Sequence, residues 1–119
     1  MFKTLYVAGL LLYGLFIYVL SDQPSLPGPM WFDNQDKLYH TGAYCILGAL
    51  LWHSIKQWLD PSVATLALLS ILLGSLYGAT DEWHQSFIPG RSPSVADWLA
   101  DTIGVSLAVF CLHKLRKHP

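Results

Sequence analysis

The sequence has few charged residues for its length. Asp, Glu, Lys and Arg together account for 13% of its 119 residues, whereas 53% are hydrophobic. A soluble domain this short would need many more charged side chains to cover its surface, so the composition argues against one. The eight acids and seven bases nearly cancel, and they cluster between long apolar runs. We therefore expect most of the surface to face lipid, and no pattern typical of nucleic-acid binding is present.

Cysteine is also scarce, with only Cys45 and Cys111 in the chain. In the helices predicted below, which rise about 1.5 Å per residue, the two lie at very different depths. A disulfide requires Cα atoms within about 7 Å, so these cysteines should not pair. Their spacing matches no metal-thiolate motif either. We expect two free thiols, which excludes a disulfide-stabilised fold and a thiol redox site.

Four apolar segments are of the length that crosses a bilayer. They predict an all-α, polytopic membrane protein, a bundle of four transmembrane helices that forms a single domain over residues 1–119. The helices are expected near 5–21, 38–55, 62–80 and 93–113. No small-x-small cleavage site follows Leu20, so a retained first helix is favoured over a signal peptide. Pro61 should open the third helix, and Ser92 and Pro93 should start the fourth. The GxxxG spacing at 74–78 should allow close helix packing.

Basic residues are distributed unequally between the two ends of this arrangement. Lys37 and Arg91 fall at one end, and the other end carries Lys3, Lys56, Lys114, Arg116 and Lys117. Because cytoplasmic loops are enriched in Lys and Arg, both termini are predicted to be cytoplasmic in a bacterial inner membrane. His53, His113 and His118 are expected to be interfacial or solvated.

Acidic residues, by contrast, concentrate at the predicted outer end. The second helix begins with Asp36, Lys37, His40 and Tyr44, the third ends with Asp81, Glu82, His84 and Gln85, and the fourth begins with Asp97 and Asp101. Only about ten largely apolar residues follow Asp101, about 15 Å of helix, so Asp101 should lie below the interface. An ionised carboxylate there needs a polar cavity or a partner such as Lys37, Arg91 or His40.

We therefore expect these side chains to converge on an outward-facing polar pocket at the ends of the second, third and fourth helices. The loop between the first and second helices, 22–35, should lie on the membrane surface. Trp83, Phe87 and Ile88 are expected to cover the pocket by dipping into the interface.

Two stretches, DKLYHTGAYCILGALL (36–51) and GATDEWHQSFIPGRSPSVADWLADTIG (78–104), resemble the VanZ-like family of small membrane proteins. The ordered set Asp-Lys-x-x-His, Asp-Glu-x-x-Gln, Pro-Gly-Arg and a following aspartate carries the resemblance. The family is named after an accessory protein of glycopeptide resistance that lowers sensitivity to teicoplanin, so the resemblance suggests a cell-envelope protein linked to teicoplanin resistance. It implies site roles for Asp36, Lys37, His40, Tyr44, Asp81, Glu82, Gln85, Pro89, Gly90, Arg91, Asp97 and Gly104. Where the family commonly has asparagine, this chain has Asp101.

Several of these residues have two interpretations. Asp36 and Lys37 either cap a helix or belong to the pocket. His40 and His84 lie beside carboxylates and are ligand types that suit zinc or manganese, but their spacing is no known metal signature. Structural hydrogen bonding is favoured for them, and no cofactor is predicted. Arg91 either binds a phosphate or carboxylate in a bidentate manner or neutralises nearby acids.

Two function classes fit this arrangement. The favoured one is a non-catalytic protein that binds the anionic head group of a lipid or lipid-linked cell-wall precursor through Arg91 and Lys37. The alternative is a membrane-embedded hydrolase or transferase acting on a lipid phosphate or ester, metal-assisted or with His40 or His84 as general base. A proton-coupled carrier ranks third, because four short helices are a small body for alternating access unless the protein forms a homodimer.

Overall fold

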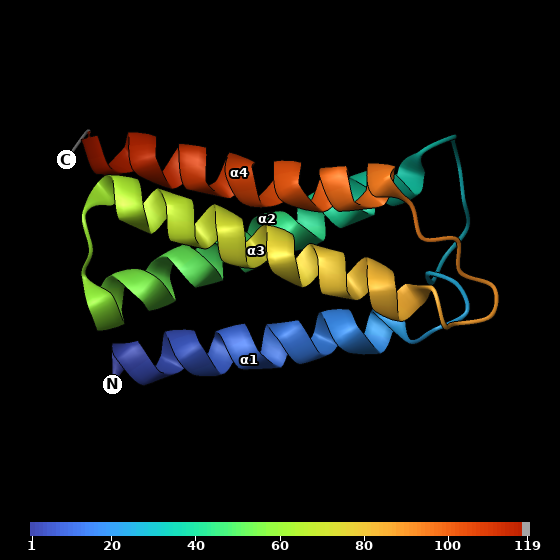
Figure 1. The fold of residues 1–119 in the computed structure, drawn as a ribbon, viewed down its shortest axis with the longest axis horizontal. Helices are drawn as coiled ribbons and strands as arrows, with labels where there is room; N and C mark the ends of the chain where they lie inside the picture. Colours follow the sequence, from blue (N-terminus) through green and yellow to red (C-terminus); the bar gives the residue numbers. More distant parts are fainter. Residues whose placement is uncertain (118–119) are drawn as a thin grey trace.

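The computed structural model describes residues 1–117, and the described chain consists of four helices without strands. These are α1 (Phe2–Ser21), α2 (Gln35–Leu59), α3 (Val63–Gln85) and α4 (Val95–Lys117). The helices alternate in direction, so both termini lie at one end of the bundle, called here the terminal end (Figure 1). The connections 22–34 and 86–94 lie at the opposite end, the loop end (Figure 1). The predicted all-α class is confirmed, whereas His118 falls outside the described residues.

The helices extend beyond the apolar segments from which they were predicted. α2 gains residues at both ends, and α3 continues as far as Gln85. The prediction that Ser92 and Pro93 start the fourth helix is wrong, because α4 begins at Val95 and the Ser94 hydroxyl accepts the Asp97 backbone N–H at 3.0 Å. The end of an apolar run marks where the helix leaves the lipid, but the helix itself can continue where its side chains contact polar groups of the protein. The acidic motifs therefore lie on helices rather than in loops.

α2 lies at the centre of the bundle and contacts all three other helices, α4 most extensively. Its buried face includes Tyr44, Leu47 and Trp52, which belong to the same core as Val105 and Val109 of α4. The two helices approach closely at Gly104, where an added Cβ would lie only 2.2 Å from the Thr41 carbonyl oxygen. Gly104 therefore sets the spacing and depth at which α4 packs on α2.

The GxxxG sequence of α3 faces α4, as predicted. A Cβ added at Gly74 would lie 2.5 Å from a Val105 methyl group, and one added at Gly78 would lie 3.0 Å from the Asp101 carboxylate. Small residues let membrane helices pack closely without a hydrophobic driving force between them. Gly78 also leaves the space that the Asp101 side chain occupies inside the bundle.

The outer surface of the bundle is strongly apolar. Leu11, Leu12, Leu68 and Leu115 are among many large hydrophobic side chains that are mostly exposed. Three helices, α1, α3 and α4, are long and apolar enough to cross a membrane. α2 does not meet the same criterion because polar residues occupy both of its ends. Cys45 and Cys111 are free thiols, as expected.

Candidate functional site

The polar residues singled out above gather at the loop end, where α2 and α4 begin and α3 ends (Figure 1). They gather there because the helices alternate in direction, which brings the start of α2, the end of α3 and the start of α4 to the same end of the bundle. Asp81, Asp97, Asp101, His40 and Gln85 are all buried there. Buried ionisable groups need partners, so their contacts determine what this region can do.

Lys37 joins α2 to α4, because its ammonium group donates to two carboxylates. Its Nζ lies 2.7 Å from Asp36 Oδ2 and 2.6 Å from Asp97 Oδ1. The Asp97 side chain is almost completely buried, whereas about a third of the Lys37 side chain remains exposed. Asp36 also stands in the first turn of α2, where an acid favours the helix dipole, so capping and ion pairing coexist there. Lys37 thus bridges two carboxylates at the rim of the site, and its single positive charge offsets one of their two negative charges.

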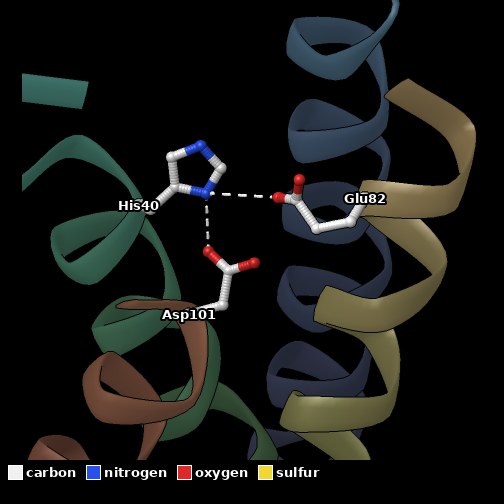
Figure 2. Close-up of side chains that lie close together, drawn as sticks. All are labelled: His40, Glu82 and Asp101. Carbon is white, nitrogen blue, oxygen red and sulfur yellow. Dashed lines mark hydrogen bonds and ion pairs between the residues drawn. The ribbon is translucent and has the colours of Figure 1, made fainter. Parts of the chain in front are cut away.

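A second group of three residues lies deeper and comes from three helices. His40 of α2 places Nδ1 at 2.7 Å from Asp101 Oδ1 of α4 and 3.8 Å from Glu82 Oε1 of α3. Figure 2 shows that the imidazole faces both carboxylates. Of the three partners considered for Asp101, the structure therefore selects His40 and not Lys37 or Arg91.

The carboxylate of Asp81 has its own set of hydrogen-bond donors. Tyr44 donates to it at 2.8 Å and Gln85 at 3.4 Å, and the Ser21 hydroxyl also donates to it. All three donors are buried. Ser21 was not anticipated from the sequence, where it simply ends the first apolar run, and only its proximity to α3 reveals its contribution. This network satisfies Asp81 without a cation.

These groups border a cavity of about 400 Å³ at the loop end. Asp36, His40, Gln85, Arg91 and Asp97 line it together with Pro24, Ser25, Leu26, Gly28 and Met30 from the connection 22–34. A smaller hollow of about 70 Å³ adjoins it, bordered also by His40, Gln85 and Arg91 and reaching Tyr44 and Asp81. The larger volume falls in the range of small-ligand sites, about 300–1,000 Å³.

Trp83, Phe87 and Ile88 were expected to cover this cavity, but none of them lines it. Trp83 and Phe87 are mostly exposed and pack against each other with ring centroids 5.2 Å apart. The connection 22–34 borders the cavity instead, and Gln35 holds it in place. The Gln35 side chain accepts the Trp31 N–H at 2.7 Å and donates to the Pro29 carbonyl at 3.1 Å. A glutamine at the edge of a loop carries no sequence signal for this role.

Arg91 lies in the cavity wall without an acidic partner. Its Nη1 donates to the backbone carbonyls of Leu20 and Gln23 at 3.3 and 3.4 Å, which ties the connection 86–94 to the end of α1. Within residues 1–117, no carboxylate forms an ion pair with Arg91. Of the two interpretations of Arg91, neutralisation of Asp81, Glu82, Asp97 or Asp101 is therefore not supported by a direct ion pair.

His84 does not join His40. Its ring stacks on Tyr18 at 4.5 Å between centroids, and its Nε2 lies 3.1 Å from Asp22 Oδ1. It therefore belongs to the contact between α1 and α3, and a metal site that uses both histidines is not formed. Asp22 was missed in the sequence because it follows the first apolar run as an ordinary loop residue.

Comparison with known proteins gives one match. The model of a family described as VanZ/LLP1 matches residues 7–116, nearly the whole described chain. No curated protein and no solved structure matches the chain. The match includes every residue of the loop-end cluster described above.

Proposed function

Because this chain belongs to the VanZ/LLP1 family, we propose that it is a VanZ-like membrane protein that binds an anionic head group in its loop-end cavity. The ligand is a membrane lipid or a lipid-linked cell-wall precursor, held by its phosphate or carboxylate. The observation that carries the proposal is the unpaired guanidinium of Arg91 in the cavity wall.

The geometry around Arg91 suits an anion. Only its Nη1 contacts protein acceptors, through two long hydrogen bonds to the Leu20 and Gln23 carbonyls. A guanidinium has five donors in a planar fork, and the fork matches the oxygens of a phosphate or carboxylate. A head group in the cavity would occupy donors that the protein leaves free.

The neighbouring acids do not prevent anion binding at Arg91. Lys37 pairs with both Asp36 and Asp97, and the carboxylate of Asp81 accepts hydrogen bonds from Tyr44 and Gln85. Lys37 is also partly exposed at the rim, where its ammonium group lies between the two acids that line the cavity. An incoming phosphate therefore meets lining acids that are already paired with Lys37 and an arginine without an acidic partner.

The membrane arrangement forms part of the proposal. The bundle is 44 Å long, close to the thickness of a bilayer with its head groups, about 40–45 Å. α2 packs against α1, α3 and α4, so it would cross with them as a fourth transmembrane helix. Lys3 near the start of α1, Lys56 near the end of α2, and Lys114 and Arg116 near the end of α4 belong to the terminal end, which favours cytoplasmic termini in a bacterial inner membrane. The cavity would then open at the outer leaflet.

A second candidate function is a hydrolase or transferase acting on a lipid phosphate or ester. It is favoured by the buried hydrogen bond between His40 and Asp101, because a carboxylate that orients an imidazole is the arrangement of a general base. His40 borders the same cavity as Arg91, so a bound head group would lie near both. In that case Arg91 would position the substrate.

The test compares lipid retention by Arg91 variants. Protein extracted from membranes containing phosphatidylglycerol and phosphatidylethanolamine is analysed by native mass spectrometry as wild type, Arg91→Gln and Arg91→Lys. Hydrogen bonds to charged groups contribute about 1.5–3 kcal/mol, so Arg91→Gln should reduce retention of the anionic lipid by about 10-fold or more. Arg91→Lys should recover only part of it, because lysine cannot form the bidentate contact.

Arg116→Gln is the matched control, since it removes an exposed arginine from the terminal end. Equal retention by Arg91→Gln and Arg116→Gln would refute head-group binding at the cavity. Turnover of a supplied lipid phosphate that is lost in His40→Gln would instead favour the enzyme. A contribution to teicoplanin resistance rests on the family alone, and growth in teicoplanin with and without expression of this protein tests it.

A further inference from the structure

Three groups of metal-ligand type converge at one point inside the loop end. His40, Glu82 and Asp101 each offer one ligand atom, and these atoms all lie within 4.8 Å of one another. Each residue comes from a different helix, α2, α3 and α4, and Figure 2 shows the three side chains pointing toward a common centre. The sequence analysis considered a metal site of His40 and His84 with neighbouring carboxylates, and the structure brings only His40 together with two acids, Glu82 and Asp101.

The carboxylates of this cluster also lack some of the hydrogen-bond donors that buried oxygens need, and this supports a cation site independently of their spacing. Asp101 is completely buried at 0% exposure, and its Oδ2 has no hydrogen-bond partner in the described chain. The Glu82 Oε1 atom is also buried without a partner, although Glu82 Oε2 accepts the Ser94 N–H at 3.2 Å. Buried carboxylate oxygens without donors are unfavourable, so an additional positive group would stabilise both atoms.

The charges of the region lead to the same conclusion. Five carboxylates on the helices, those of Asp36, Asp81, Glu82, Asp97 and Asp101, lie at the loop end in addition to Asp22 and Asp33 of the connection 22–34, with only two permanent cations, Lys37 and Arg91. Lys37 pairs with Asp36 and Asp97, so its single charge is shared by two acids, and Arg91 pairs with neither Glu82 nor Asp101. One divalent cation between His40, Glu82 and Asp101 would compensate two carboxylates that have neither a permanent cation nor a full set of hydrogen-bond donors.

We propose that His40 Nδ1, a Glu82 oxygen and an Asp101 oxygen bind one divalent cation, with Zn²⁺ as the preferred ion. One imidazole and two carboxylates are a donor set that zinc accepts, and a three-residue site leaves a fourth position open. Ligand atoms of a tetrahedral zinc lie about 3.3 Å apart for bonds of about 2.0–2.1 Å. The observed Nδ1 distances of 2.7 Å to Asp101 and 3.8 Å to Glu82 lie on either side of that value.

Binding requires small changes in side-chain position and the loss of one proton. A metal-bound nitrogen has no hydrogen, so any proton on His40 Nδ1 leaves for solvent as the metal enters. The site depends on no lipid ligand, so it stands or fails separately from head-group binding at Arg91.

The experiment measures zinc binding to the purified full chain in detergent, carrying an affinity tag without histidine. The protein is stripped with a chelator, titrated with ZnCl₂, and assayed by isothermal titration calorimetry and by metal analysis after gel filtration. We expect one zinc per chain and a higher melting temperature in its presence. The conservative variants His40→Gln, Glu82→Gln and Asp101→Asn should each weaken binding by at least about 100-fold.

Two controls separate this site from adventitious binding. His84→Gln and Asp22→Asn alter the neighbouring histidine and acid pair at the same end of the bundle, and both should leave zinc binding unchanged. Asp101→Asn removes a charge without changing shape, so the apo variant should remain folded and elute as a single species.

Three results would overturn the proposal. The first is absence of stoichiometric zinc from the folded wild type, which would mean that protons compensate the buried acids. The second is equal zinc affinity in wild type, Glu82→Gln and Asp101→Asn. The third is loss of zinc binding in His84→Gln. Reduced lipid retention in Arg91→Gln would alter none of these outcomes, so failure of either proposal can be recognised by itself.

Discussion

Substitution of Gly104 by alanine should disrupt the site through the packing of α2 on α4. The added Cβ would lie 2.2 Å from the Thr41 carbonyl oxygen and 3.0 Å from the Cys45 nitrogen. Both atoms belong to the α2 backbone, so no side-chain rotation can relieve the contact. Because Cβ atoms essentially never approach closer than 3.0 Å, the two helices must separate by at least about 0.8 Å at this point.

This separation reaches the buried cluster directly. His40 immediately precedes Thr41, and Asp101 lies one turn before Gly104, so the two side chains move with the backbones that clash. Their contact of 2.7 Å would lengthen to about 3.5 Å, the limit of a hydrogen bond. Overpacking of this kind costs about 1–3 kcal/mol, to which loss of the hydrogen bond adds about 1.5–3 kcal/mol.

The assay is reversible unfolding in mixed detergent micelles, followed by tryptophan fluorescence, with zinc affinity measured in parallel. Gly42→Ala is the matched control, because Gly42 lies on α2 close to Thr41 but an added Cβ there meets nothing within 4 Å. Gly104→Ala should lower the free energy of unfolding by at least about 2 kcal/mol and weaken zinc binding, whereas Gly42→Ala should do neither. Equal stability and equal zinc affinity in the two variants would refute the close approach of the α2 and α4 backbones.

Two further predictions concern the Asp81 network and the topology. Tyr44→Phe removes a donor from the buried Asp81 carboxylate and should lower the free energy of unfolding by about 1.5–3 kcal/mol. Tyr18→Phe is the control and should change it little, because Tyr18 is a half-exposed ring stacked on His84. Similar losses in the two variants would contradict the network. In a background without Cys45 and Cys111, a cysteine at Ser25 or Ser86 should react with an impermeant thiol reagent in intact cells, and one at Lys114 only after lysis. The opposite labelling pattern would invert the proposed orientation.

The helical architecture could be predicted from sequence because it depends on local composition. Long apolar runs indicate helices of bilayer length, and turn-forming stretches separate them. The GxxxG spacing at Gly74 and Gly78 indicated a packing face that the structure confirms against α4. Helix ends were less predictable, since hydropathy does not report the polar contacts that let α3 continue to Gln85.

Residue spacing also indicated that acids and bases would meet at one end, because neighbouring helices alternate in direction. It could not indicate which partners would pair. Lys37 pairs with Asp97 and His40 with Asp101, whereas His84 turns toward Tyr18 and Asp22 on α1. Spacing along a helix defines a face but not the rotation or depth of that face relative to another helix.

Rotation and depth depend on contacts between residues far apart in the chain. Gly104 against Thr41 sets how α4 meets α2, and Gly78 provides the space that Asp101 fills. These contacts place Asp101 beside His40 and leave Arg91 with backbone carbonyls as its only partners among residues 1–117. Composition and spacing therefore account for the helices and for the end at which the polar residues gather. The pairing of those residues depends on interhelical packing, because a shift of about 1 Å is enough to make or break a hydrogen bond.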